Sequence, residues 1–259
     1  MNINVGKNIR VSDFIDSRDN RSVLLDLTAS SSVGAGPGTE DIGEVLRQFN
    51  ASFDGLILNP GQLEHHAALI GGKMRAAPLV RVDWTNAYRN KEFCLPATVV
   101  TRVPISDAED ALRLGASAAV ATFLLGFGED MEAENVRSIS LLARECYRLS
   151  LPLIVDIRPI GDKVTDDNYQ GAIKLGTSFM MEAGADALIL PDCDNETCAL
   201  LGKWVTIPVL LRLDEIPTTE RMEALLGKGL MGVVLTERFV ATQDEDRKSL
   251  NPKELIHRL

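Results

Sequence analysis

Three segments of this chain place charged side chains inside runs that are otherwise apolar. Each carries an arginine and an aspartate two residues apart: Arg81 and Asp83, Asp156 and Arg158, and Arg212 and Asp214. Side chains two apart share one face of a strand, and an unpaired charge in an apolar interior is strongly unfavourable. We therefore expect these groups to face one another, a ligand, or water at one end of a sheet.

These residue types suit two kinds of arrangement. Arginines bind an anionic or polyhydroxylated ligand, and a carboxylate beside them is available for proton transfer. We predict Asp26 and Asp156 as the acid or base. The predicted ligand-binding residues are Asn59, Arg81, Asp83, Trp84, Arg158, Asp192, Arg212, Asp214, Glu237 and Arg238. The structural alternative is an ion-pair network that plugs the end of the sheet.

Eight short apolar runs, separated by helix-like stretches, must position these side chains. The runs are Ser22 to Asp26, Gly55 to Asn59, Pro78 to Asp83, Ala118 to Leu125, Leu151 to Arg158, Asp186 to Asp192, Ile207 to Asp214 and Gly232 to Arg238. This pattern is typical of a parallel sheet buried on both faces, and eight units close as a (β/α)8 TIM barrel. Because such barrels react at the carboxyl ends of their strands, the polar ends of the runs are the predicted site.

The length of 259 residues suits one such α/β domain. We divide it into an N-terminal extension at 1–21, which caps or flanks the barrel, a barrel at 22–241, and a C-terminal helix or tail at 242–259. The first connection, from Thr28 to Gly38, is rich in glycine and serine. It is predicted as a plain loop, a lid or a weak phosphate cradle, and it has no Walker lysine.

The composition argues for a small-molecule ligand. A formal net charge of −10 disfavours a nucleic-acid or anionic-membrane partner. No segment has the length of a membrane span or the apolar core of a signal peptide, so we expect a cytoplasmic protein. The four cysteines lack paired CxxC spacing, which predicts reduced thiols and neither a disulfide framework nor a zinc site. No metal or cofactor is predicted.

Several stretches match the scaffold of a known family. They are Asp26 with Gly36-Pro37, the segments 54–61 and 111–120 followed by Gly126, Pro159 with Gly161, and the segment 182–187. On these residues the chain resembles the archaeal-type class I fructose-bisphosphate aldolases and their deoxyribose-phosphate aldolase relatives. The resemblance implies the barrel fold, an aldolase-type lyase activity and a homo-oligomer.

This chain differs from the family at the residue that is central to the family's chemistry. The resemblance implies a Schiff-base lysine at the end of the sixth strand, where this chain has Ile189. Among the remaining lysines, Lys163 follows the fifth strand and is the one candidate for a relocated nucleophile, although a surface lysine is its commoner identity. The family's phosphate-binding glycines correspond to Leu213 and Asp214, and a carboxylate there disfavours phosphate.

Three hypotheses follow from these residues. The first is an aldolase-like carbon–carbon lyase, or a related isomerase, that acts on a small carbonyl or sugar-type compound without the family lysine. The second is a non-catalytic aldolase-fold protein that binds a ligand or assembles with an active paralogue. The third is a lyase assisted by Mg²⁺ or Mn²⁺ held by the carboxylates.

Overall fold

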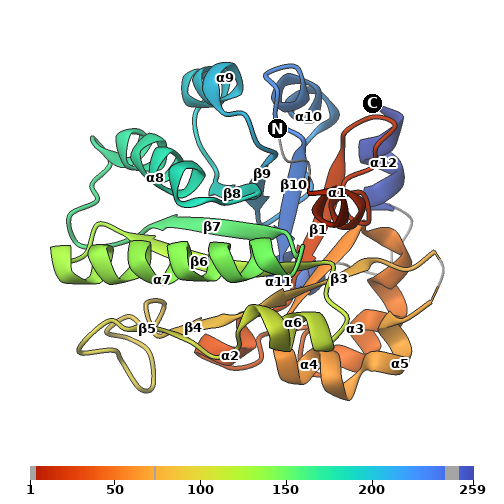
Figure 1. The fold of residues 1–259 in the computed structure, drawn as a ribbon, viewed down its shortest axis with the longest axis horizontal. Helices are drawn as coiled ribbons and strands as arrows, with labels where there is room; N and C mark the ends of the chain where they lie inside the picture. The colour runs from red at the N-terminus through yellow and green to blue at the C-terminus, as the bar shows by residue number, and fades with distance from the viewer. Residues whose placement is uncertain (1–3, 73, 243–250) are drawn as a thin grey trace.

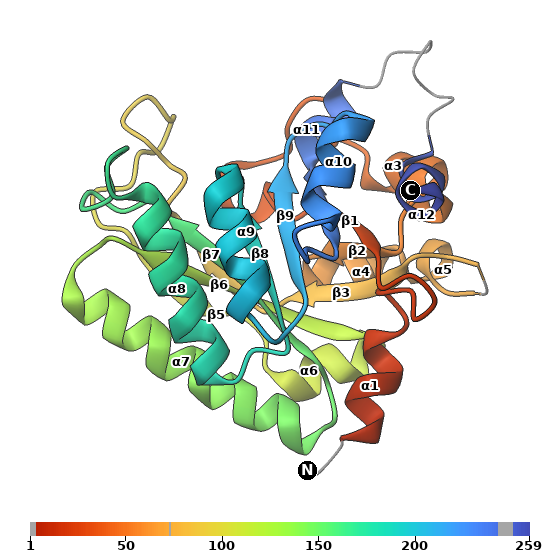
Figure 2. The same ribbon diagram turned by 90° about the horizontal axis from the view of Figure 1, so that it is seen from above.

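The computed structural model describes residues 4–72, 74–242 and 251–259. Within these residues eight parallel strands close into a barrel in the order β1-β10-β9-β8-β7-β6-β3-β2, and the helices lie outside it (Figures 1 and 2). The predicted (β/α)8 barrel is confirmed. None of the described helices is long and apolar enough to cross a membrane.

The strands agree closely with the apolar runs of the sequence. The barrel strands are β1 (Ser22–Asp26), β2 (Gly55–Leu58), β3 (Ala77–Arg81), β6 (Ala118–Leu125), β7 (Leu153–Pro159), β8 (Ala187–Pro191), β9 (Val209–Leu213) and β10 (Gly232–Thr236). Two further strands, β4 (Asp83–Thr85) and β5 (Arg102–Pro104), pair antiparallel outside the barrel.

Helices fill the connections between the strands. They are α1 (Val5–Val11), α2 (Ser30–Val33), α3 (Ile42–Phe49), the 3₁₀ turn η1 (Asn50–Ser52), α4 (Pro60–His65), α5 (Ala67–Ile70), α6 (Ala108–Arg113), α7 (Glu129–Arg148), α8 (Tyr169–Ala183), α9 (Asn195–Trp204), α10 (Thr219–Leu226), α11 (Glu237–Ala241) and α12 (Pro252–Arg258). Helix α1 lies in the predicted N-terminal extension, and α12 lies in the predicted C-terminal tail.

The sequence predictions fail at two strand ends. Asp83 was expected on the third barrel strand, but that strand ends at Arg81 and Asp83 begins β4, where it pairs with Pro104. Glu237 and Arg238 were expected on the eighth strand, but they form the first turn of α11 because the preceding Thr236 caps that helix. Both differences bring charged side chains from a connection, rather than a strand, to the end of the barrel.

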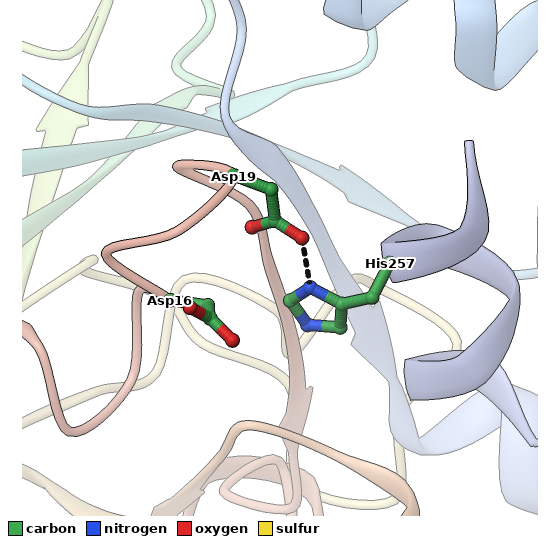
Figure 3. Close-up of side chains that lie close together, drawn as sticks. All are labelled: Asp16, Asp19 and His257. Carbon is green, nitrogen blue, oxygen red and sulfur yellow. Dashed lines mark hydrogen bonds and ion pairs between the residues drawn. The ribbon is translucent and has the colours of Figure 1, made fainter.

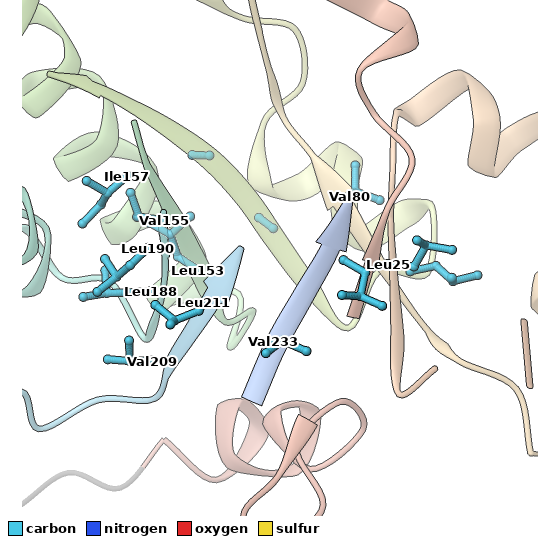
Figure 4. Packing of buried hydrophobic residues seen from close by; sticks show 14 of the residues in the cluster. Leu25, Val80, Leu153, Val155, Ile157, Leu188, Leu190, Val209, Leu211 and Val233 are labelled. Carbon is cyan, nitrogen blue, oxygen red and sulfur yellow. The ribbon is translucent and has the colours of Figure 1, made fainter. Parts of the chain in front are cut away.

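Two apolar clusters hold the barrel together. Outward-facing side chains such as Leu25, Val155 and Leu211 pack under the helices (Figure 4). Inward-facing side chains form a second cluster, in which Phe14 and Ile15 from the N-terminal segment close the amino-terminal end of the barrel. The extension therefore caps the bottom of the barrel, one of the two positions predicted for it.

The interior cluster follows the layered packing of this fold, in which alternate strands supply four side chains to each layer. One layer holds Leu24, Leu79, Ile154 and Leu210, and the next toward the carboxyl ends holds Ile57, Val120, Ile189 and Val234. The next layer toward the carboxyl ends is supplied by β1, β3, β7 and β9, as the first layer is. Its side chains are charged and not apolar.

Candidate active site

Two aspartates and two arginines form a complete layer of the barrel interior. Asp26, Arg81, Asp156 and Arg212 come from β1, β3, β7 and β9, which are every second strand around the barrel. Arg81 Nη2 lies 2.9 Å from Asp26 Oδ2 and 3.1 Å from Asp156 Oδ2, and Arg212 Nη2 lies 2.7 and 2.6 Å from the same two oxygens. Opposite charges therefore alternate around a neutral group, which we call the charged layer.

Burial makes this layer an integral part of the core. The exposed fractions of the four residues are 5% for Asp26, 7% for Arg81, 0% for Asp156 and 8% for Arg212. Charges buried to this extent are tolerated only when each is paired and hydrogen-bonded, and here each carboxylate contacts both arginines. The prediction that the strand charges face one another is confirmed for these four residues.

Hydroxyl groups complete the hydrogen bonding of the layer. The Thr28 hydroxyl donates to Asp26 Oδ1 at 2.6 Å and accepts from Arg81 Nε at 2.8 Å, while the Thr122 hydroxyl accepts from Arg81 Nη1 at 2.7 Å. The same Thr122 hydroxyl donates to Asp83 Oδ1, and Arg102 Nε donates to Asp83 Oδ2 at 2.8 Å. These contacts extend the network to the β4–β5 hairpin.

The charged layer keeps its carboxylates ionised. Burial alone would raise the pKa of Asp26, but the adjacent guanidiniums of Arg81 and Arg212 outweigh burial and hold that pKa below its usual range. Asp156 has a lowered pKa for the same reason, with Arg158 as its strongest partner. A carboxylate held ionised by two arginines is a weak base, so the predicted acid–base role of Asp26 and Asp156 is poorly supported.

A polar cavity of about 510 Å³ lies over the charged layer at the carboxyl ends of the strands. Its wall combines three residues of the layer, Asp26, Arg81 and Arg212, with Asp83, Arg158, Asp214, Glu237 and Arg238 and with the uncharged residues Thr28, Ala29, Ser32, Val33, Thr85, Tyr88, Thr122 and Thr236. The lining holds four arginines and four carboxylates. None of these lining residues, which all belong to the described part of the chain, is a lysine.

Glu237 is the carboxylate in this wall that is suited to exchange a proton. Burial raises its pKa, the nearby negative charge of Asp26 raises it further, and Arg238 opposes them. Its buried Oε2 makes no hydrogen bond within the described residues. A carboxyl group that has a raised pKa and belongs to a cavity wall has the properties of a general acid or base.

The neighbouring loops form a second charged group at the rim. Asp214 accepts a hydrogen bond from the Thr236 hydroxyl at 2.7 Å and one from Arg238 Nη1 at 2.9 Å. Arg212, two residues before Asp214, is engaged by the charged layer and does not pair with it. Arg158 pairs within its own strand, with Nε 2.9 Å from Asp156 Oδ1, and its guanidinium lies over the Tyr88 ring.

Five predicted residues do not line the cavity: Asp156, which is fully buried in the charged layer, and four residues that lie elsewhere. Trp84 Nε1 donates to the Ser31 carbonyl, and the buried Asn59 donates to the Thr28 carbonyl, so both anchor the first loop. Asp192 pairs with Arg221 on the surface, and Lys163 pairs with Glu129 at 2.5 Å with about half of its side chain exposed. The structure does not bring Lys163 to the charged layer.

A different group of potential metal ligands lies at the opposite end of the barrel. Within the described residues, Asp16, Asp19 and His257 are the one histidine, cysteine or carboxylate cluster close enough to hold an ion (Figure 3). However, His257 Nδ1 already contacts Asp19 at 2.6 Å, its Nε2 contacts Asp54 at 3.0 Å, and Asp16 pairs with Arg18. These partners leave the three side chains no ligand atom that lacks a contact.

Comparison with known sequences decides the family. A model of the DeoC/LacD family aldolases matches residues 21–188, which is more than half of the chain. The chain belongs to this aldolase family. The DeoC/LacD match covers β1 to the start of β8, and thus three of the four strands that carry the charged layer.

Relatives of this DeoC/LacD aldolase span nearly its whole length. An uncharacterized aldolase of Saccharolobus solfataricus is 24% identical over 98% of this chain and 95% of its own, and a class 1 fructose-bisphosphate aldolase of Thermoproteus tenax is 25% identical over 85% and 82%. The structure of an archaeal fructose 1,6-bisphosphate aldolase superimposes with a TM-score of 0.76 at 21% identity, covering 97% of this chain and 99% of that one. A Schiff-base-forming fructose-1,6-bisphosphate aldolase gives 0.77 at 22% identity, covering 97% and 98%. This likeness shows the shared barrel.

The position predicted for the family lysine is remote from the cavity in this chain. Ile189 is fully buried in the apolar layer directly below the charged layer, and it does not line the cavity. The charged layer therefore separates the side chain at 189 from the space a ligand would occupy.

Proposed function

We propose that this DeoC/LacD aldolase is a carbon–carbon lyase, or a related isomerase, for a small polyhydroxylated carbonyl compound without a phosphate group, and that it works without a Schiff-base lysine. The observation that carries this proposal is the environment of the Glu237 carboxyl group. Glu237 lines the cavity at the end of the barrel where enzymes of this fold react, its pKa is raised, and its buried Oε2 has no hydrogen-bond partner within the described residues.

In the proposed reaction, the Glu237 carboxylate removes the proton from the hydroxyl group β to the substrate carbonyl. The carbon–carbon bond then breaks, and its electron pair moves toward the carbonyl carbon to give an enolate and a free aldehyde. Glu237 returns its proton to the enolate carbon. A guanidinium stabilises the negative charge that develops on the enolate oxygen, and Arg212 is suited to this because it lines the cavity.

Charge balance supports an unphosphorylated substrate. Barrels of this class commonly bind phosphate at the loops after the last two strands and at the start of a short helix. In this chain those loops present Asp214 and Glu237, and Arg238 is already paired with Asp214. A phosphate would meet two carboxylates there, whereas hydroxyl groups can donate to the same oxygens.

The first test is proton exchange in deuterated water, followed by NMR, with dihydroxyacetone and dihydroxyacetone phosphate. The proposal predicts enzyme-dependent loss of the C–H signal of dihydroxyacetone and less exchange of the phosphate. Borohydride treatment of the same mixtures should leave the protein mass unchanged. A reduced adduct, above all on Lys163, would overturn the lysine-independent mechanism.

The second candidate function is a non-catalytic barrel, and one observation favours it: the four charges of the charged layer neutralise each other at 2.6–3.1 Å. This candidate predicts no exchange and no adduct with dihydroxyacetone, glyceraldehyde, pyruvate or their phosphates. The metal-assisted candidate gains no such support, because arginines already share the two deepest carboxylates.

We also propose that the protein is cytoplasmic and self-associates, as an alternative to assembly with an active paralogue. Light scattering after size-exclusion chromatography measures the mass of the purified protein. A particle of one chain's mass at micromolar concentration would contradict self-association.

A further inference from the structure

Two cysteines separated in the sequence lie in contact at the carboxyl end of the barrel. Cys193 follows β8, Cys198 lies in α9, and their Sγ atoms are 3.2 Å apart. Cys193 is half-buried, whereas Cys198 is fully buried. The sequence predicted no disulfide because the four cysteines lack paired CxxC spacing, but the turn into α9 brings the two sulfurs together.

The environment of the pair differs from that of the other cysteines. A hydrogen bond from the Cys193 thiol stabilises the Cys198 thiolate and lowers the pKa of Cys198. In contrast, burial raises the pKa of Cys146 to about 12, and Cys94 is exposed. Within the described residues, the hydrogen-bonded sulfur pair is formed by Cys193 and Cys198 alone.

We propose that Cys193 and Cys198 form a reversible disulfide by exchange with a low-molecular-weight disulfide such as oxidised glutathione. The half-exposed Cys193, after loss of its proton, attacks one glutathione sulfur, which forms a mixed disulfide and releases one glutathione thiolate. The Cys198 thiolate then attacks the Cys193 sulfur. The second glutathione thiolate leaves, so the protein loses two electrons and two protons while the glutathione disulfide is reduced to two thiols.

The geometry needs little movement for this step. A disulfide bond is about 2.05 Å long, so the two sulfurs must approach by about 1 Å, a shift that the exposed loop beside Cys193 can accommodate. The bridge would tie the loop after β8 to the first turn of α9. The neighbouring Asp192 holds that loop to Arg221 on α10, so the link would join three elements at the rim.

The experiment is incubation of the whole protein with oxidised glutathione, followed by intact mass and peptide mapping without reduction. Wild type should lose the mass of two hydrogens, with the bridge mapped to Cys193 and Cys198. The C198S variant should stop at one glutathione on Cys193, and C193S should show neither product at this site. Dithiothreitol should restore the starting mass.

The exposed Cys94 provides a matched control, because C94S should still form the bridge at the wild-type rate. The proposal is overturned by a stable glutathione adduct on Cys193 of the wild type, or by oxidation at Cys94 with no mapped bridge. Since Cys193 lies in a surface loop, C193S is expected to fold even where C198S loses stability. The C193S result therefore tests the proposed bridge even where C198S is unstable.

Discussion

Arg212 and Asp26 lie two strands apart around the barrel, yet their side chains meet at 2.7 Å inside it. The same Arg212 nitrogen also contacts Asp156 at 2.6 Å on the other side. One guanidinium thus joins β1, β7 and β9 through charge-assisted hydrogen bonds. The barrel is closed at this level by ion pairs and not by apolar packing.

Removal of one charge from this layer should strongly destabilise the fold. In D156N, the three arginines that contact Asp156 lose a shared anion in a buried site, and we expect a loss of about 3–5 kcal/mol in the free energy of unfolding. Urea denaturation measures it. The exposed pair of Asp192 and Arg221 is the control, because D192N should cost at most about 1 kcal/mol. Equal losses in the two variants would contradict an integral role for the charged layer.

Substitution of Glu237 should remove proton transfer while the fold is retained. E237Q is expected to lower the rate of deuterium exchange into dihydroxyacetone by about 100-fold or more. Because the carboxylate form is the base and its pKa is raised, the wild-type rate should increase as the pH rises through that pKa. The pH profile of E237Q should be flat over the same range. The exposed helical variant E223Q is the control, and its exchange rate should match wild type.

Neutralising Asp214 should make the rim accept phosphate. D214N removes one repulsive charge and releases Arg238 from its 2.9 Å ion pair. We expect the affinity for dihydroxyacetone phosphate to rise about tenfold, an effect of the size that one nearby charge produces at a protein surface. Calorimetric titration measures the affinity, with unphosphorylated dihydroxyacetone for comparison. An unchanged ratio between the two ligands would contradict the proposed phosphate exclusion.

Restoring a lysine at the family position should not restore Schiff-base chemistry. The I189K side chain would lie in the apolar layer, below the charged layer and outside the cavity. We expect a large loss of stability, since an unpaired ammonium group in an apolar interior costs several kcal/mol, and no borohydride adduct with dihydroxyacetone. Thermal melting and intact mass check the two expectations. A trapped adduct on residue 189 would show that substrate reaches below the layer.

His257 should make the stability of the protein depend on pH. Its hydrogen bond to Asp54, aided by Asp19, raises its pKa above the ordinary value of 6.5, while burial opposes this shift. The stabilisation is therefore fully present below about pH 6.5 and is lost as the pH rises through the higher folded-state pKa. We expect H257Q to flatten this part of the curve of melting temperature against pH. The exposed His65 is the control, and an H65Q curve that flattens equally would assign the effect elsewhere.

The fold was largely predictable because each barrel strand is a continuous apolar run. Ser22–Asp26 and Ala118–Leu125 match their predicted ranges, and the others differ by one or two residues at their ends. The errors occur where a charged residue ends a run. Asp83 continues the alternation of β3, but its pairing with Arg102 depends on a hairpin that returns many residues later. No local pattern of the sequence contains that contact.

The sequence predicted which residues form the site better than it predicted what each of them contacts or does. Spacing identified Arg81, Asp156 and Arg212, because charge inside an apolar strand is rare and needs a partner. The partners themselves cross the barrel, so the sequence did not show that Arg212 would pair with Asp26 while Asp214 pairs with Arg238. Thr28 and Thr122 were missed, since nothing in the sequence around a threonine indicates that its hydroxyl bonds to buried charges. The raised pKa of Glu237 depends on burial, which composition and spacing do not determine.

The charged layer lies at the base of the cavity, and its four charges pair with one another across the barrel. The charges in the cavity wall are not linked in this way. A change at any one of the four residues of the charged layer disturbs the two layer residues that it contacts, which lie on two other strands, so this level resists substitution one residue at a time. The wall residues Asp214, Glu237 and Arg238 belong to two adjacent connections and contact few others. Divergence in substrate preference within this lineage is thus expected to be concentrated in those two connections, while the barrel beneath them stays unaltered.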